Sequence, residues 1–170
     1  MPAGLKGTSS VIAVGFSATE PAPNTFTQAQ IDLNLSPLDR EVFVVLAVNM
    51  DSSAPSAIAA TDTAVRGRLT STSQTAIPSL ADTNCLSAIT SQISAAGFVD
   101  GGVSFTSQAL ETPPSTLDYI GIIATNDFFV QVQGTNNVAP MGISGKLYGY
   151  RAVASADIYA ALVQSEVLSA

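Results

Sequence analysis

The sequence predicts an all-β protein, built as an antiparallel β-sandwich of about eight strands. Three observations lead to this prediction. Segments in which apolar and polar residues alternate recur roughly every 10–20 residues along the chain. Clusters of proline, glycine, serine and asparagine separate these segments, and such residues end strands and form turns. Two segments alone have the apolar spacing of a helix, one inside the chain and one at its C-terminal end.

The first three predicted strands lie in the N-terminal third of the chain. Residues 11–18 and 25–35 alternate between apolar and polar side chains, the pattern of a strand with one buried face. Pro21 and Pro23 separate these two strands, because proline cannot donate a hydrogen bond to a neighbouring strand. Residues 41–50 are apolar on both faces for most of their length. We therefore expect this third strand at the centre of a sheet, covered on both sides.

The middle of the chain predicts a strand, a helix and two further strands. Residues 63–72 turn apolar residues to one face and two arginines to the other. A short helix is predicted over residues 83–96, with Gly97 placed to end it. The residues that carry the helical spacing are Leu86, Ile89 and Ile93. Residues 103–110 and 119–124 are the next predicted strands.

The strongest strand signal lies near the C-terminal end. Residues 128–133 place Val130 and Val132 on one face and Gln131 and Gln133 on the other, which we expect to be a solvent or interface face. Val130→Asp is accordingly expected to abolish folding, and Gln131→Asp to leave the fold intact. A second strand, at residues 143–153, is expected to pair with the first as an antiparallel neighbour through a loop of about eight residues.

Two shorter segments complete the prediction. Residues 125–127 have the composition of a hairpin turn leading into the strand at 128. The last segment predicts a C-terminal helix over residues 156–168, for which Ser155 is a suitable N-cap. Residues 1–10 are expected to be a lead-in of small residues before the first strand. The whole chain, residues 1–170, is thus predicted to form a single domain.

Charge is scarce in this sequence. Charged residues make up 11% of the 170 residues, and the net charge is −7. Ordinary soluble domains contain about 25% charged residues, so much of this surface is expected to meet other protein. The six basic residues do not cluster, and direct nucleic-acid binding is therefore not expected. They are Lys6, Arg40, Arg66, Arg68, Lys146 and Arg151.

Most of the chemistry that enzymes use is missing. The chain contains no histidine, which removes histidine-based catalysis and histidine metal sites. Cys85 is the single cysteine, so it has no disulfide partner in its own chain, and we expect a structural role for it. Residues 142–146 superficially match a nucleophile elbow and a phosphate loop, but Pro140 and Leu147 break the second motif and the spacing breaks the first. No transmembrane segment or signal peptide is expected.

Carboxylates and aromatic residues leave two further kinds of site to consider. The acids in predicted turns, which could act as a catalytic pair or hold Ca²⁺, are Asp51, Asp100, Asp118 and Asp127. The aromatic residues that could form a ligand platform are Tyr119, Phe128, Phe129, Tyr148 and Tyr150. We expect the acids to serve as turn residues and the aromatic residues to serve as core. No catalytic, cofactor-binding or metal-binding residue is therefore predicted.

The strand-rich chain, the segments FFVQVQGTNN and GISGKLYGYRAV, and the short closing helix together resemble a single jelly-roll capsid protein of an icosahedral virus. The resemblance covers most of the chain as a pattern. It implies an eight-stranded jelly-roll sandwich, self-assembly into a shell and no enzymatic activity. Capsid proteins of small RNA viruses typically carry a basic arm, whereas residues 1–10 contain one lysine. The resemblance therefore points to a DNA virus.

The sequence thus predicts a non-enzymatic structural protein of the virion, whose partners are copies of itself and other virion proteins. One alternative is an extracellular fibre or pilus-like subunit, in which residues 9–16 complete the sheet of the next subunit. Another is a carbohydrate-binding or adhesion module at the cell surface that uses exposed tyrosines.

Overall fold

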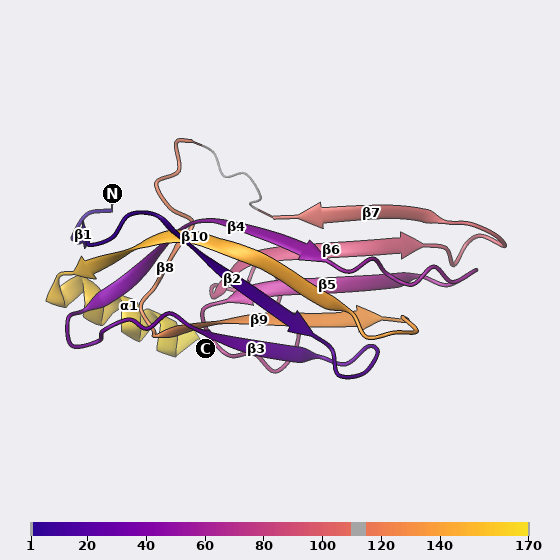
Figure 1. Cartoon of the computed structure of the whole chain (residues 1–170), viewed down its shortest axis with the longest axis horizontal. Helices are drawn as coiled ribbons and strands as arrows, with labels where there is room; N and C mark the ends of the chain where they lie inside the picture. Colours follow the sequence, from indigo (N-terminus) through magenta and orange to yellow (C-terminus); the bar gives the residue numbers. More distant parts are fainter. Residues whose placement is uncertain (1, 110–114, 170) are drawn as a thin grey trace.

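Two antiparallel β-sheets pack face to face as a sandwich in the computed structural model, which describes residues 2–109 and 115–169 (Figure 1). Sheet A is built from β1 (Leu5–Gly7), β2 (Ile12–Thr19), β4 (Glu41–Ser52), β8 (Gly121–Ile123) and β10 (Gly142–Ala154). Sheet B is built from β3 (Thr27–Asp32), β5 (Thr63–Thr70), β6 (Cys85–Ser94), β7 (Val103–Gln108) and β9 (Asp127–Thr135). The predicted all-β, antiparallel sandwich is therefore confirmed.

The strands are arranged as a jelly roll. In sheet A, β10 lies between β4 and the N-terminal strands β1 and β2, and β8 pairs with the other side of β4. In sheet B the order is β3, β9, β5, β6, β7. When β1 and β7 are set aside, eight of the ten strands remain, and they pair first with last, second with seventh, third with sixth and fourth with fifth. This nested pairing is a long hairpin rolled into two sheets, which is the jelly-roll topology.

The main core lies between the two sheets. Its largest fully buried side chains come from both layers and include Phe43 and Leu147 from sheet A and Leu69 and Phe128 from sheet B. Phe16 meets Phe128 edge to face, with ring centroids 6.1 Å apart. Aromatic pairs prefer this geometry over a face-to-face stack. The inward faces of the alternating strands thus bury one another, as their sequence pattern predicts.

A second apolar cluster covers the outer face of sheet A. The helix α1 (Ala156–Ser169) places Tyr159, Leu162 and Val163 against Val42 and Val44 of β4 and against the end of β10. The alternate residues of β4 point the other way, into the main core. This strand is therefore central and covered on both faces, and its prediction and that of the C-terminal helix are confirmed.

The predicted helix over residues 83–96 is wrong, since β6 occupies most of it. Ile89 and Ile93 are four residues apart, and a separation of four places two residues on one face of a strand as well as of a helix. Leu86 breaks the alternation because it is the extra residue of a bulge, where Thr70 pairs with Cys85 and the next pair is Leu69 with Ser87. The β-branched and hydroxyl residues of this segment favour the strand.

The two strongest strands do not pair with each other. β9 lies in sheet B between β3 and β5, and β10 lies in sheet A, so the predicted antiparallel pair is wrong. Each strand has one apolar face, and Val130 and Leu147 join the same core across the sandwich instead. The predicted hairpin turn at residues 125–127 is wrong for the same reason, because β8 pairs with β4 in the opposite sheet from β9.

Two further predictions need correction. Residues 1–10 are not a mere lead-in, because β1 pairs with Ala152–Ala154 of β10. Gln131 lies on the face of β9 away from the core, as predicted, yet its side chain is fully buried. The Gln131 amide donates to Gln28 Oε1 at 2.9 Å and to Thr70 Oγ1 at 2.7 Å, and Gln28 Oε1 also accepts from Gln74 N in the loop that follows β5.

Candidate assembly surfaces

The first candidate surface is the free edge of sheet B. β7 is the last strand of this sheet and pairs with β6 (Figure 1). Its sequence, VSFTSQ, contains no charged residue and no proline. Natural proteins usually protect exposed edges with lysine, proline, a bulge or a covering loop. Within the described part of the chain, no strand pairs with the outer side of β7, so this edge is available to another strand.

The backbone N–H groups of β7 point alternately to β6 and to the free edge of the sheet. Ala109 N donates to Ala88 O of β6 at 2.9 Å. Since the N–H groups of a strand alternate between its two sides, those of Ser107, Phe105 and Val103 also point to β6. The N–H groups of Ser104 and Thr106 therefore point outward, along the free edge.

Apolar side chains gather beside this edge. Val103 and Phe105 are 55% and 49% exposed, and Phe98 and Val99 are exposed in the loop just before the strand. We call these four residues the β7 patch. Contiguous exposed apolar residues are typical of interaction sites in soluble proteins. Two residues of the patch, Val103 and Phe105, lie on the strand whose outer backbone is unpaired, so one partner strand could cover both.

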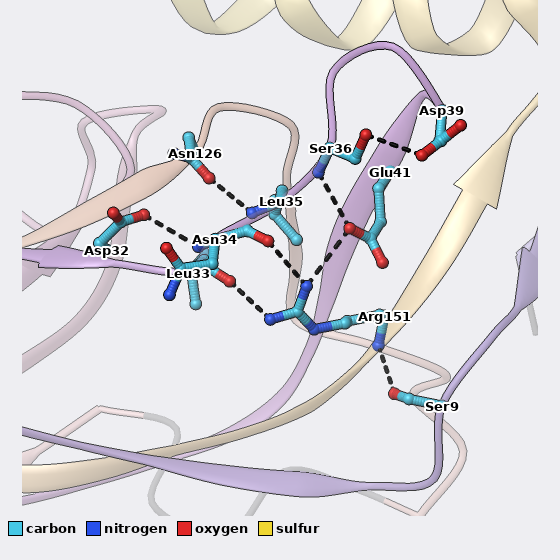
Figure 2. Close-up of polar contacts among 10 residues, drawn as sticks. All are labelled: Ser9, Asp32, Leu33, Asn34, Leu35, Ser36, Asp39, Glu41, Asn126 and Arg151. Atoms are coloured by element: carbon cyan, nitrogen blue, oxygen red, sulfur yellow. Dashed lines mark hydrogen bonds and ion pairs between the residues drawn. The ribbon is translucent and has the colours of Figure 1, made fainter.

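The second candidate surface is a rigid turn between β3 and β4, at the opposite end of the sandwich (Figure 1). Arg151 fixes the base of this turn from the inward face of β10 (Figure 2). Its guanidinium donates to Leu33 O at 2.7 Å and to Asn34 O at 2.9 Å, and it forms an ion pair with Glu41 at 3.3 Å. An arginine fork is well suited to hold several acceptors in fixed directions.

The tip of this turn exposes one leucine. Arg40 N donates to Pro37 O at 3.1 Å. Figure 2 shows a second hydrogen bond of the turn, in which Ser36 Oγ donates to Asp39 Oδ2 at 2.8 Å. Leu38 stands between these bonds and is 95% exposed. We call residues 36–41 the Leu38 turn. An apolar side chain held out by so many hydrogen bonds is a preformed contact, because little entropy is lost when it binds.

Buried Glu20 fixes the loops at the end of the sandwich that lies opposite the Leu38 turn. Its carboxylate accepts from the backbone N–H groups of Thr25, Gly134 and Met141, at 2.7, 3.1 and 2.9 Å. Asn137 extends this network, since its Oδ1 accepts from Ser56 N at 2.9 Å. The loops after β2, β4 and β9 are therefore tied into one rigid rim. In the sequence, Glu20 stands out only as a residue before a proline.

The sequence-predicted acids and aromatic residues are scattered. Asp51, Asp100, Asp118 and Asp127 lie on four different segments, and the described residues hold no group of three or more potential metal-binding side chains. Phe128 is in the core, as expected. Tyr150 packs against the second apolar cluster, where burial and the nearby charge of Asp118 raise the pKa of its hydroxyl. These aromatic side chains do not form one platform.

Cys85 and residues 142–146, which the sequence analysis considered as possible sites, both belong to strands. Cys85 is buried at the start of β6, and its thiol donates to Ser87 O at 3.4 Å. Burial raises the pKa of this thiol, which keeps it in the neutral form. Residues 142–146 begin β10 and are strand backbone rather than a ligand-binding loop. The strand that a fibre subunit would release, β2, pairs with β10 of its own chain over residues 12–19.

No helix among residues 2–109 and 115–169 combines the length and apolar character needed to cross a membrane. No protein-family profile matches the chain, and no curated protein sequence matches it. A solved chain from Desmodium yellow mottle tymovirus resembles this structure with a TM-score of 0.33 and 11% sequence identity, over 92% of this chain and 95% of that one. At this TM-score the assignment of the jelly roll rests on the order of the strands within this chain.

Proposed function

We propose that this chain is a non-enzymatic structural subunit that assembles with copies of itself, and that β7 forms one of the contacts between copies. The uncharged, exposed edge of β7 carries this proposal. A second copy can add its own β7 as an antiparallel neighbour, so that the two sheets become continuous. Val103 and Phe105 of one copy then lie beside the same residues of the other copy, on one face of the new pair.

Charge favours a second copy as the occupant of this edge. Each chain carries a net charge of −7, so two copies repel one another over most of their surfaces. β7 is free of charge, and pairing there adds no repulsion at the contact itself. Its neighbour β6, CLSAITSQIS, is also uncharged. The β7 edge is thus one place where copies of this protein can approach closely.

The finer proposal is that the assembly is a closed shell, as in the viral capsids that the sequence resembles, with copies of the chain and other virion proteins as partners. Two features support it. The jelly roll presents rigid loop ends on either side of the sandwich, held by Glu20 at one end and Arg151 at the other. A structural subunit needs such fixed ends, because each contact must repeat with the same geometry in every copy.

The test is the native mass of the protein, measured by light scattering and followed by electron microscopy of the same sample. We expect closed particles of megadalton mass. A stable species of about 17 kDa, the mass of one chain, would contradict self-assembly. Open filaments would contradict the closed shell and favour the fibre.

Substitutions at Ser104 test the role of β7 directly. Ser104→Pro removes an outward N–H and places a ring on the free edge, while the hydrogen bonds to β6 stay in place. It should leave a folded protein that no longer assembles. The matched control is Ser104→Ala, which removes the same hydroxyl and keeps the N–H, and which should assemble like the unmodified chain. Equal assembly of both variants would exclude the β7 contact.

A further inference from the structure

The second half of β4 has an open backbone edge. β10 pairs with one side of β4 from Glu41 to Ser52, with a bulge at Leu46. On the opposite side, β8 pairs with Phe43–Val45, and within residues 2–109 and 115–169 no other strand pairs there. A cavity of about 470 Å³ lies between this open edge and strands β6 and β7 of sheet B. The edge of β4 is therefore within reach of side chains from sheet B.

The direction of the β4 backbone shows which groups face the open edge. Ser53 N, directly after the strand, donates to Gly142 O at the start of β10, at 2.9 Å. Since N–H groups alternate between the two sides of a strand, those of Asp51 and Asn49 also point to β10. The N–H and C=O groups of Met50 therefore point to the open edge. Met50 is only 6% exposed, so its backbone groups need a partner inside the protein.

The side chain of Gln108 is that partner. Gln108 lies opposite Ile89, a residue of the main core, so its side chain points from β7 toward sheet A. In the amide orientation that satisfies both groups of Met50, the Gln108 oxygen accepts from Met50 N at 2.8 Å. Its nitrogen then donates to Met50 O at 3.2 Å. A residue of a neighbouring antiparallel strand makes the same pair of bonds with its own N–H and C=O.

We propose that Gln108 takes the place of a neighbouring strand and seals the open edge of β4, so that copies of this protein pair through β7 and not through β4. This inference rests on the proposed self-assembly and names what directs it to one edge. A second strand cannot bind the backbone of Met50 while the Gln108 amide occupies it.

The neighbouring edge, on β7, has no such seal. Its outward N–H groups, on Ser104 and Thr106, have no strand beside them within the described part of the chain. Natural proteins protect the sheet edges that must stay unpaired, because an open edge is a template for another strand. One side of the sandwich thus carries a blocked edge and an open one. This difference gives assembly a direction.

Gln108 also joins the two edges, because it is the last residue of β7. Its bonds to Met50 tie the C-terminal end of β7 to sheet A, while the backbone of β7 is paired with β6 of sheet B. The open edge of β7 is therefore held in a fixed position relative to both sheets. Contacts that repeat in every copy need such a fixed position.

The first experiment measures hydrogen exchange of single amides by NMR, below the concentration at which the protein assembles. In the unmodified chain, the amides of Met50 and Asn49 should both exchange slowly. Gln108→Ala should make Met50 exchange about tenfold faster or more, because its N–H loses the acceptor. Asn49 is the internal control, since its N–H points to β10 and should keep its rate.

Two results of this experiment would overturn the inference. If Met50 exchanges equally slowly in both proteins, Gln108 does not protect the edge. If Asn49 accelerates as much as Met50, the side chain acts on the stability of the whole sheet and is no seal. Neither result depends on whether copies pair through β7.

The second experiment asks whether the opened edge of β4 binds another copy. It starts from Ser104→Pro, which should be monomeric, and is done at high salt to screen the charge of Asp51 on the same strand. Adding Gln108→Ala should restore association, seen by light scattering as a mass above the 17 kDa of one chain. The matched control adds Thr106→Ala, on the same face of β7 and in the lining of the same cavity, and should stay monomeric.

Equal masses for the two double variants would contradict the seal. If Ser104→Pro alone assembles like the unmodified chain, the β7 contact of the proposed function fails instead. The exchange rate of Met50 separates these two failures, because it reports on Gln108 in the single chain.

Discussion

At the scale of single residues, buried polar side chains hold the irregular parts of this protein in place. Glu20, Glu166, Asn137 and Arg151 each bind backbone groups of segments that are distant in the sequence. A loop cannot be buried unless its N–H and C=O groups find partners. These four side chains supply such partners, so the loops at both ends of the sandwich have fixed positions without regular structure.

Glu166 makes the stability of the protein depend on pH. Burial raises the pKa of its carboxyl, although the N–H groups of Ala124 and Thr125 oppose this rise. The folded protein thus holds the proton more tightly than the unfolded chain does. The contribution of Glu166 to the free energy of unfolding is therefore largest below the ordinary glutamate pKa, and declines as the pH rises through the folded value.

Glu166→Gln removes this dependence, because glutamine does not ionise. Urea unfolding of both proteins over a range of pH gives the difference in their free energies of unfolding. Relative to the variant, the unmodified protein should lose stability as the pH rises across that window. If the unmodified protein instead gains stability relative to the variant as the pH rises, the folded protein favours the carboxylate form of Glu166, contrary to this expectation.

Gln131 gives a second residue-scale prediction. Its amide is fully buried and donates to Gln28 and Thr70, so Gln131→Asp would bury a carboxylate. Its cross-strand neighbour Arg68 already donates to the carbonyl groups of Gly67, Pro78 and Ile89, so this guanidinium is not free to pair with the new charge. We expect a loss of about 3 kcal/mol or more in the free energy of unfolding. This replaces the expectation from the sequence that the variant folds normally. Gln133→Asp is the control, because Gln133 is less buried and pairs with Arg66 across the strands, and it should change little.

At the scale of elements, α1 stabilises the outer face of sheet A. Tyr159 lies on the packed side of the helix, against the cluster that includes Val42 and Val44. Tyr159→Ala should lower the free energy of unfolding by about 1–3 kcal/mol, since Tyr159 is only partly buried. Ala160→Ser, at the neighbouring exposed position, should have almost no effect. Equal losses in urea unfolding would show that α1 stabilises the fold in some other way.

Sequence alone identified most elements but few of their partners. β2, β5, β9 and β10 could be recognised from the alternation of their residues, because each strand buries one face, and β4 from its apolar residues on both faces. Which residues of a strand are buried is recorded in the sequence of that strand alone. Pairing depends on which strand lies opposite, and β9 and β10 look like hairpin partners until the sheets are known. The bulge at Leu86 made a strand look helical, since one extra residue shifts the alternation.

The candidate surfaces were harder to foresee for the same reason. Residues 103–110 were predicted as a strand, yet nothing in them marks an edge. Leu38 is an ordinary turn residue in the sequence, and its exposure follows from bonds made by Arg151 and Ser36. The bonds between Gln108 and Met50 join two strands that only the fold brings together.

At the scale of the whole molecule, the low number of charges predicts how assembly responds to salt. Copies with a net charge of −7 repel, and salt screens this repulsion. The proposed contact at β7 is apolar and backbone in kind, so it contains no ion pair for salt to weaken. The concentration at which particles form should therefore fall as sodium chloride is raised, which light scattering can follow. A rise would indicate an assembly held by ion pairs.

The nested pairing of the strands also has a consequence for synthesis of the chain on the ribosome. β2 is complete early, yet its partner β10 belongs to the last part of the chain to be made. At about 5–20 residues per second, β2 waits on the order of ten seconds with its apolar residues and backbone uncovered. During this interval β2 can pair only with a strand other than β10 of its own chain, so exchange of β2 between copies competes with correct folding.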